Sequence, residues 1–497
     1  MLLFVDWNLF ELEDILEDLL FFIVIVLLPF IKQLNKPFFS NFVCFIYVLY
    51  IILETTSYIA VSSNFSSSFM YLLLESNTDE LKEFSTSYIS IPIIIFIILN
   101  SFLFFIIRKV KFKATNKSYS IIGLISIIFI LIILKFSGLI ESNAYHNIIR
   151  GTYGYIDLQT SLKINSDITK EDIEITSDNE ILVFVLGEST ARGHLQIYDY
   201  RRKTTPLLES IKDSLFVFNN VISTDVFTLK SVPKILTSLD IVSKKEKVFN
   251  IVDVFNTAGY KTYWLSNQRP ISYHDNVVSK IASGSDMFKF YNHIIDKNTV
   301  VIDEIMLPDY NEILKKPGKK VVFLRLIGTH FDYNKRYPES FNKFGDNLNE
   351  KSKSKTIINQ YDNAILYNDY IIYSLIDNLK KMNSKSALLY LSDHGENVYD
   401  NGTDFFGRSE EILTKSMFEI PFILWTSENF EFPKDFEYNS KRKFMADHTY
   451  ESIGHIFGVL HKSMDSKKSI FSERFKERKR LVLNGLDYDE FFVEKNE

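Results

Sequence analysis

Residues 181–194 read ILVFVLGESTARGH, and this stretch decides how the second half of the chain folds. Its first six residues are all apolar, which predicts a strand buried on both faces of a sheet. Glu188 comes just after this strand. In α/β domains the side chains that follow parallel strands gather at one edge of the sheet, where ligands bind. The stretch therefore predicts a fold class and a candidate functional residue together.

Similar short apolar runs recur along the rest of the chain. They cover residues 214–218, 261–265, 321–326, 387–392 and 420–425, and helical patterns lie between them, including a long one at 356–382. Strands that alternate with helices predict an α/β domain with a mainly parallel sheet. We expect this domain to span residues 179–465.

Three of the predicted strands are followed by residues of types that can bind metals. Glu188 follows the first, Asp393 and His394 follow the strand in ALLYLSDHGEN (387–397), and His330 follows the strand in VVFLRLIGTHFDY (321–333). A single carboxylate at a strand end is more often a helix cap. Three such ends meeting at one edge favour a metal site, and oxygen and nitrogen ligands of this kind suit zinc better than manganese or magnesium.

Several hydroxyl groups are candidates for a nucleophile beside such a metal. Thr224 and Thr228 precede a helical pattern, and a hydroxyl at a helix start lies where the helix dipole also favours a phosphate. A metal bound to that hydroxyl would lower its pKa. Ser189 and Thr190 are rivals because they adjoin the glutamate of the first strand. Spacing alone does not separate these four residues, and a Ser-His-Asp hydrolase is disfavoured because the sequence has no G-x-S-x-G motif.

The first part of the chain is predicted to lie in a membrane. Four apolar runs, at residues 15–31, 38–61, 88–107 and 118–136, are long enough to cross a bilayer. We therefore expect residues 1–140 to form a transmembrane domain of four spans. The alternative is a soluble domain with four buried core helices.

Loop charges predict the orientation of these spans. Residues 1–18 hold six acidic residues and no basic one, whereas residues 108–117 hold five basic residues and no acidic one. Basic loops stay in the cytoplasm, so the N-terminus and everything after residue 140 should face outward. The acidic start does not resemble a secretory signal.

Three further segments complete the predicted organisation. Residues 66–84 are too polar to span the membrane and predict a helix that lies on its outward-facing surface, with a plain connecting loop as the alternative. Residues 141–178 are expected to be a linker, and residues 466–497 a charged, solvated tail.

Composition excludes other classes of protein. The chain has 497 residues and a net charge of −6, which argues against nucleic-acid binding as its main task. Its single cysteine, Cys44, excludes an intramolecular disulfide and a cysteine-based zinc or iron–sulfur site.

Five motifs in a fixed order carry a family resemblance. They are GESTARGHLQIYDYRRKTTP (187–206), TDVFTLKSVPKIL (224–236), GTHFDYNKRYP (328–338), YDNAILYNDYII (361–372) and LSDHGENVYDNG (391–402). Together they resemble the phosphoethanolamine transferases of Gram-negative inner membranes, within the alkaline phosphatase and sulfatase superfamily. The resemblance covers nearly the whole chain. The stretches SNQRPISYHDN (266–276) and VYDNGTDFFGRSEE (398–411) favour the branch that modifies the lipopolysaccharide core.

The resemblance implies roles for the residues at the strand ends. Thr228, which stands 40 residues after Glu188, corresponds to the family nucleophile. Glu188, Thr228, Asp393 and His394 would bind the first zinc ion. His330 matches a family histidine near the substrate phosphate and a second metal position.

The resemblance also implies a substrate-binding region. Ser76 and Glu80 fall where the family contacts the ethanolamine group, and an acid there would supply the counter-charge of the ammonium. The family lysine and serine that hold the donor phosphate have no clean match. The candidate replacements are Asn267, Gln268, His274 and Asp275. The alternative is that these four are ordinary polar residues of the surface.

Three departures from the family pattern stand out. The family often has a histidine at the position of Phe406, 13 residues after Asp393, so a second zinc would lack that ligand. Many relatives have five spans, whereas four are predicted here. Many also have periplasmic disulfides.

The resemblance implies an enzyme of the bacterial inner membrane with its catalytic domain in the periplasm. It would transfer phosphoethanolamine from phosphatidylethanolamine to a lipopolysaccharide acceptor, a core sugar or lipid A, by a ping-pong mechanism through a phosphoethanolamine-threonine intermediate. The added ammonium groups would weaken the binding of cationic peptides such as polymyxin.

Two alternative functions stay open. One is another enzyme of the sulfatase superfamily: a phosphoglycerol transferase, which Glu80 disfavours, or a sulfatase, which Thr228 disfavours. The other is a membrane scaffold that has lost catalysis, which Phe406 favours and the retained zinc ligands oppose.

Overall fold

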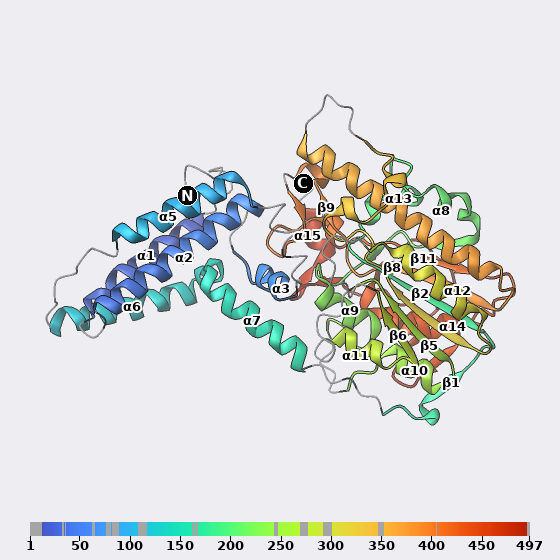
Figure 1. Ribbon diagram of the computed structural model, residues 1–497. Coiled ribbons are helices and arrows are strands. Elements are labelled where there is room, and N and C mark those ends of the chain that lie inside the picture. Colours follow the sequence, from blue (N-terminus) through green and yellow to red (C-terminus); the bar gives the residue numbers. More distant parts are fainter. Residues whose placement is uncertain are drawn as a thin grey trace. The chain divides into compact units, whose positions relative to one another are not determined.

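The computed structural model describes residues 12–31, 34, 36–61, 65–75, 81, 89–107, 117–161, 164, 167–242, 247–268, 277–291, 301–345, 352–403 and 405–494. Figure 1 draws the chain coloured from its N-terminus to its C-terminus. It forms two compact units, one of residues 1–157 with 410–412 and the other of residues 158–409 with 413–497.

Helices make up the first unit. They are α1 (Leu12–Leu27), α2 (Pro37–Val61), α3 (Ser67–Glu75), α5 (Ile91–Ile107), α6 (Lys117–Phe136) and the start of α7 (Ala144–Ser161). Among the described residues, Pro37–Ile59 and Ser118–Phe136 are long and apolar enough to cross a membrane, which fits two predicted spans. Helices α1 and α5, of 16 and 17 residues, cover the other two predicted spans but are shorter. The count of four spans therefore stays a prediction.

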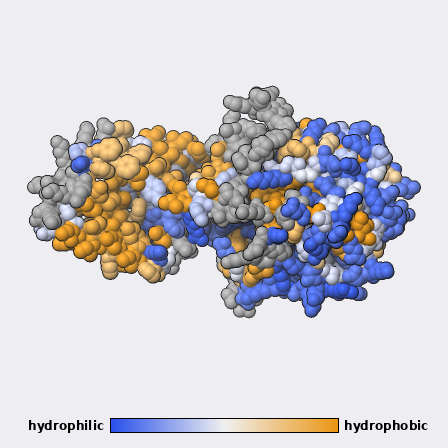
Figure 2. All heavy atoms as spheres, turned by 90° about the horizontal axis from the view of Figure 1, so that it is seen from below, coloured by the Kyte–Doolittle hydropathy of each residue, from blue (hydrophilic) through white to orange (hydrophobic). Residues whose placement is uncertain are grey.

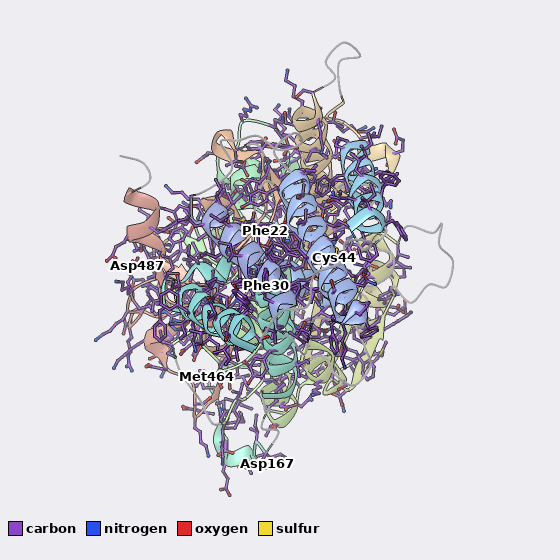
Figure 3. All side chains as sticks on the ribbon, turned by 90° about the vertical axis from the view of Figure 1, so that its left-hand side faces the viewer. Phe22, Phe30, Cys44, Asp167, Met464 and Asp487 are labelled. Carbon is purple, nitrogen blue, oxygen red and sulfur yellow. The ribbon has the colours of Figure 1, made fainter. Side chains whose placement is uncertain are left out.

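The surface of this helical unit is apolar. Ile98 and Phe102 of α5 and Phe129 of α6 are each more than 60% exposed. Figure 2 shows hydrophobic residues covering this unit, while the other unit has a mainly hydrophilic surface. Phe22 and Cys44, labelled in Figure 3, lie on α1 and α2. A soluble bundle would turn its apolar residues inward, so this surface suits lipid rather than water.

The second unit is built on a sheet of seven strands in the order β3-β11-β8-β2-β7-β5-β6. Their bounds are β2 (Ile181–Gly187), β3 (Leu215–Val217), β5 (Lys261–Ser266), β6 (Met287–Phe290), β7 (Lys320–Arg325), β8 (Ser386–Ser392) and β11 (Phe422–Thr426). Neighbours from β8 to β6 pair in parallel, but β11 runs antiparallel to both β8 and β3. The sheet is therefore mixed: parallel pairing extends from β8 to β6, whereas β11 and β3 pair antiparallel, so the prediction of a mainly parallel sheet is not confirmed for the sheet as a whole.

Helices cover both faces of this sheet. They are α8 (Pro206–Ser210), α9 (Thr228–Leu236), α10 (Ile251–Thr257), α11 (Val277–Ser283), α12 (Leu307–Lys315), α13 (Lys353–Lys380) and α14 (Thr449–Phe457). Figure 1 shows α13 along one side of the sheet and α9, α10 and α11 along the other. Leu182, Phe184 and Leu186 of β2 belong to the core cluster on the side of α9 to α11. Because successive residues of a strand face opposite sides, Val183 and Val185 point toward the other layer.

Among the residues that the structure describes, four short strand pairs lie outside the central sheet. They are β1 (Ile173–Ile175) with β13 (Val459–His461), β4 (Val221–Ile222) with β12 (Phe444–Met445), β9 (Asn397–Val398) with β10 (Phe406–Gly407), and β14 (Leu481–Val482) with β15 (Leu486–Asp487).

The segments predicted as connections contain regular structure. The expected linker at 141–178 holds α7 and β1. The expected tail holds α15 (Tyr488–Glu494), and its residues Phe471 and Val482 are fully buried, so it is folded rather than solvated. Helix α3 covers the first part of the predicted surface helix, while 76–80 and 82–88 lie outside the described residues.

The strand order places the candidate site. Strand β2 lies between β7 and β8, and Gly187 is in register with Ser392. Because all three strands are parallel, the residues after their carboxyl ends meet at one edge of the sheet. Glu188 and Asp393 are thus brought together by the register itself.

We predict that Phe184→Ala destabilises this unit by about 3–5 kcal/mol, because the deletion leaves a cavity in the core. The Phe184 ring is 1% exposed and lies 5.9 Å from the Phe323 ring. Urea unfolding followed by tryptophan fluorescence measures the loss. Ile175→Ala, at a side chain that is 50% exposed, is the control, and equal losses in both variants would contradict the assigned core.

Candidate active site

A strained turn after β2 presents Glu188 to the site. Ser189 has φ +56°, a left-handed conformation that costs a residue with a side chain about 1–2 kcal/mol. Three bonds hold it there. The Ser189 N–H donates to Asp393 Oδ1 (3.1 Å), its Oγ donates to Glu188 Oε1 (3.0 Å), and its carbonyl accepts from Tyr361 Oη (2.7 Å). The turn is therefore fixed from both the sheet and helix α13.

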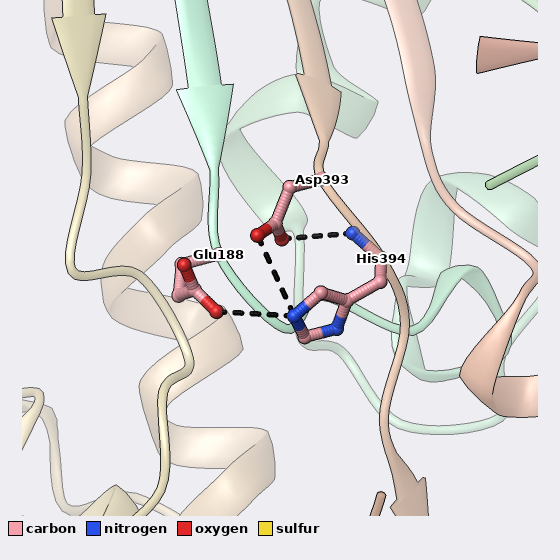
Figure 4. Close-up of side chains that lie close together, drawn as sticks. All are labelled: Glu188, Asp393 and His394. Atoms are coloured by element: carbon pink, nitrogen blue, oxygen red, sulfur yellow. Dashed lines mark hydrogen bonds and ion pairs between the residues drawn. The ribbon is translucent and has the colours of Figure 1, made fainter. Parts of the chain in front are cut away.

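Asp393 and His394 come from the loop after β8. Asp393 Oδ1 accepts from the backbone N–H groups of Ser189 and His394, whereas its buried Oδ2 accepts no hydrogen bond from the described residues. His394 Nδ1 lies 2.7 Å from the Gly395 carbonyl, which can only accept, so Nδ1 carries the proton. The other ring nitrogen, Nε2, lies 3.3 Å from Glu188 Oε1 and 3.4 Å from Asp393 Oδ2 (Figure 4).

Thr228 completes the arrangement as the first residue of α9. Its Oγ1 lies 3.0 and 3.1 Å from the two carboxylate oxygens of Glu188 and 3.2 Å from His394 Nε2. The structure thus brings together Glu188, Thr228, Asp393 and His394, the four residues predicted to share one metal. The hydroxyl also lies at a helix N-terminus, where a phosphate is favoured.

The rival hydroxyls are engaged elsewhere. Thr224 Oγ1 donates to Asp225 Oδ2 (2.6 Å), and Thr190 Oγ1 contacts the Glu188 carbonyl and Thr329 Oγ1. Ser189 Oγ reaches one oxygen of Glu188. Of these four candidates, Thr228 is the one that contacts both a carboxylate and the imidazole.

The pKa values of the two carboxylates of the site are shifted in opposite directions. Burial alone would raise the pKa of Glu188, but the hydrogen bond and charge of His394, with smaller effects of His330 and Arg408, lower it well below its usual value. Burial, with the charge of Glu188, raises the pKa of Asp393 to about 6. Two buried carboxylates so close to each other are costly unless a cation or a proton compensates them.

The donor set fits a metal ion. One ligand atom each from Glu188, Asp393 and His394 lies within 4.8 Å of the others, and all three residues are buried. With the Thr228 hydroxyl they offer carboxylate oxygen, imidazole nitrogen and hydroxyl oxygen, a set compatible with a tetrahedral zinc. The unbonded Asp393 Oδ2 is the atom that such an ion would satisfy.

His330 lies after β7 as predicted. Burial lowers its pKa to about 3, and nearby Arg408 and Arg336 add to this against the opposing charge of Glu188. The ring is therefore neutral, and its buried Nδ1 has no hydrogen-bond partner among the described residues. A neutral imidazole can hydrogen-bond to a substrate oxygen without carrying charge.

The predicted substrate-binding residues differ in whether they contact the site. Gln268 Nε2 donates to Glu188 Oε2 (3.2 Å) and to the Leu326 carbonyl (3.0 Å), so it contacts the site directly. Asn267 points elsewhere and donates to Asp303 Oδ1 (2.9 Å). Ser76, Glu80 and His274 lie outside the described residues.

Phe406, at the position of the family histidine, is part of an aromatic group in β10. Its ring stacks on Phe331 at 5.9 Å with an interplanar angle of 7°, and the Tyr399 ring lies 5.6 Å away. A phenyl ring offers no metal ligand.

Sequence reasoning assigned no role to several residues that shape the site. Tyr361 and Asp362 belong to a motif that carried the family resemblance, and buried polar residues on a predicted helix were the available signal. Asp362 Oδ1 lies 2.7 Å from His194 Nδ1, whose Nε2 lies 3.1 Å from Asp400 Oδ1. Arg408 Nη1 lies 2.8 Å from His394 Nε2, a contact that no local pattern announces.

Comparison with known proteins agrees with this geometry. The family model described as Sulfatase matches residues 180–455. The chain is 28% identical to phosphoethanolamine transferase EptC of Escherichia coli over 87% of this chain and 83% of that protein.

Two solved structures are similar. The crystal structure of the C-terminal periplasmic domain of E. coli EptC in complex with Zn superposes with a TM-score of 0.60 and 31% identity, over 64% of this chain and 95% of that one. The integral membrane protein lipooligosaccharide phosphoethanolamine transferase A of Neisseria meningitidis gives a TM-score of 0.68 over 90% of this chain and 98% of that one, and at 20% identity it shows a common fold.

We predict that His194 makes stability fall as the pH rises. Burial opposes its protonation, but Asp362 and Asp400 raise its pKa from 6.5 to about 9. The stabilisation is therefore fully present below pH 6.5 and is lost as the pH rises through 9, a loss on the order of 3 kcal/mol. Unfolding midpoints of the natural chain and His194→Gln across this range measure it. An equal slope in both proteins would sink the prediction.

Proposed function

We propose that this chain, which belongs to the phosphoethanolamine transferases of the sulfatase family, transfers phosphoethanolamine from phosphatidylethanolamine to a lipopolysaccharide acceptor. The observation that carries the proposal is the position of Thr228, whose hydroxyl contacts both Glu188 oxygens and His394 Nε2 within a buried set of metal donors. The names of the related transferases support the transferred group and the class of acceptor.

Glu188, Thr228, Asp393 and His394 would hold one zinc ion. When bound there, zinc lowers the pKa of the Thr228 hydroxyl and stabilises negative charge on the phosphoryl oxygens. Support comes from the donor set and from the zinc complex of the E. coli EptC domain.

In the first step Thr228 Oγ1 attacks the phosphorus of phosphatidylethanolamine. The Oγ1–P bond forms while the P–O bond to diacylglycerol breaks, and the proton lost from Thr228 balances the proton that diacylglycerol gains. Glu188 accepts the hydroxyl hydrogen bond and so orients Oγ1. The N-terminal N–H groups of α9 favour the phosphoryl oxygens.

His330 would act by hydrogen bonding in this step. Because its pKa is about 3, it is neutral at physiological pH and is a poor source of a full proton. We therefore assign it to a non-bridging or leaving oxygen as a hydrogen-bond donor. Gln268, which already contacts Glu188, would position that carboxylate.

In the second step a sugar hydroxyl or a phosphate of lipopolysaccharide attacks the phosphoethanolamine-threonine and frees Thr228. We place the catalytic unit in the periplasm and the helical unit in the inner membrane, as the loop charges indicate. The lipid-facing helices would then keep the donor headgroup at a high local concentration. Ser76 and Glu80 remain the proposed contacts of the ammonium.

We predict that Thr228→Ala lowers diacylglycerol release from a fluorescent phosphatidylethanolamine by about 10³-fold or more, because the attacking oxygen is gone. Thr228→Ser should retain part of the activity. Thr224→Ala is the matched control, since Thr224 bonds to Asp225 instead. Undiminished release by Thr228→Ala would refute the nucleophile, and release from phosphatidylglycerol instead would favour a phosphoglycerol transferase.

We also predict that the purified chain holds about one zinc ion. Asp393→Asn should weaken zinc binding by more than about 100-fold, because losing a direct ligand reduces metal affinity more than losing a residue that only orients a ligand. Metal analysis after dialysis against a chelator of known affinity provides the measurement. Asp435→Asn, at a carboxylate paired with His455, is the control. Unchanged zinc in Asp393→Asn would mean that these residues are not the ligands.

A further inference from the structure

The helical unit contains a cavity lined by acidic and aromatic side chains. Helices α1 and α5 both pack against α2, and residues of all three helices line the cavity (Figure 1). Its volume is about 320 Å³, which is enough for a small ligand. The polar and aromatic residues of the lining are Asp18, Tyr47, Tyr50, Glu54, Phe96 and Asn100. Among the described residues that line it, there is no lysine or arginine.

Glu54 brings a buried carboxylate to this cavity. Its side chain is 3% exposed, and its Oε2 accepts from the Phe65 N–H at 3.1 Å. The Ala144 N–H also contributes to stabilising the carboxylate. The other oxygen, Oε1, is buried and makes no hydrogen bond with the described residues. Leaving a buried carboxylate oxygen without a partner is costly, and an ionisable side chain within a membrane-spanning segment typically marks a binding site.

Two further carboxylates add negative charge beside Glu54. Tyr50 Oη lies 2.7 Å from both Glu17 Oε2 and Asp18 Oδ1. A hydroxyl group has one hydrogen, so it can donate to only one of these two oxygens at a time. The other oxygen of Glu17 accepts from Asn143 Nδ2 at 2.7 Å, which fixes this acid in place. Acidic groups held together in an apolar helical unit favour a positively charged ligand.

The aromatic rings favour an organic cation over a metal ion. The rings of Tyr47 and Tyr50 are stacked, with centroids 6.2 Å apart and an interplanar angle of 16°. Aromatic faces attract ammonium groups, whereas a divalent metal ion prefers a shell of oxygen ligands. Asn100 Nδ2 donates to the Phe96 carbonyl at 2.9 Å, so Asn100 can offer its amide oxygen as an acceptor. Rings, a carboxylate and an amide oxygen together suit an ammonium group that carries N–H donors.

The position of Glu54 along α2 suits the headgroup of a lipid. The loop charges predict that the end of α2 at Val61 faces outward. Glu54 lies seven residues before that end, which is about 10 Å along a helix and places it in the outward third of α2. In phosphatidylethanolamine two carbons separate the nitrogen from the phosphate. The ammonium can therefore enter the cavity while the phosphate stays nearer the membrane surface.

We propose that this cavity binds the primary ammonium headgroup of a membrane phospholipid, with Glu54 Oε1 as its counter-charge. A primary ammonium can donate hydrogen bonds to Glu54 and Asn100, whereas a quaternary ammonium has no hydrogen to donate. The inference deepens the proposed function, because the proposed donor lipid carries this headgroup, and it rests on that function only for the choice of phosphatidylethanolamine. It assigns residues other than Ser76 and Glu80.

The test measures how lipids protect Glu54 from chemical modification. A hydrophobic carbodiimide couples to buried carboxyl groups, and mass spectrometry of the peptide that contains Glu54 quantifies the reaction. The full-length, zinc-loaded chain in detergent carries Thr228→Ala, so that it does not consume the lipid. Phosphatidylethanolamine, phosphatidylcholine and phosphatidylglycerol are titrated separately, and sodium and magnesium chloride are tested in the same way.

Phosphatidylethanolamine is expected to protect Glu54 at a concentration at least about tenfold lower than either of the other two lipids. Tyr47→Leu should raise the half-protecting concentration by about tenfold, because it removes a ring that attracts the ammonium. Thr56→Val is the matched control. Thr56 lies two residues after Glu54 but donates to the Ile52 carbonyl of its own helix at 2.7 Å, so protection should be unchanged.

Three results would overturn the ammonium site. They are equal protection by the three lipids, protection by a metal salt instead of by lipid, and no modification of Glu54 in the lipid-free chain, since a cavity that admits a headgroup must admit the reagent. Diacylglycerol release by the chain without Thr228→Ala separates this inference from the proposed function. Protection without release would refute the transfer and leave the ammonium site standing, whereas release without protection would do the reverse.

Discussion

Everything in the site depends on holding two buried carboxylates, Glu188 and Asp393, beside the same imidazole nitrogen. Their mutual repulsion in a poorly solvated place is unfavourable, so the surrounding structure must hold them against it. The register of β2 and β8 brings the two loops together, and the left-handed turn at Ser189 bonds to both carboxylates. A cation bound between the two carboxylates would remove their repulsion, and this relief would favour its binding. That is the physical reason to expect a metal there.

Close packing of the backbone makes this arrangement rigid. A Cβ added to Gly395 would lie 1.9 Å from the Ser416 carbonyl oxygen, so the loop that carries Asp393 and His394 tolerates only glycine at that point. Gly328 has φ +52°, and a Cβ there would lie 3.0 Å from the Glu188 carbonyl oxygen. Both loops are thus pressed against neighbouring backbone, and small movements of the donors are resisted.

The fold was predictable where the signal was local. A continuous apolar run followed by a carboxylate identified β2 and Glu188, and the same reasoning found Asp393. The strand Met287–Phe290 was missed because its four residues are largely half-exposed and lie at the edge of the sheet. Gln268 and Asn267 are neighbours in sequence, yet one contacts Glu188 and the other Asp303. Arg408 reaches His394 only through tertiary packing, which no spacing encodes.

The central claim is that the Thr228 hydroxyl forms a covalent bond to the transferred group. Mass spectrometry of the zinc-loaded chain, quenched with acid after incubation with phosphatidylethanolamine and without acceptor, tests it most directly. We expect one phosphoethanolamine group on the peptide that contains Thr228, and its disappearance when acceptor is added. An adduct on Ser189 or Thr190, or turnover with no adduct at all, would contradict the account.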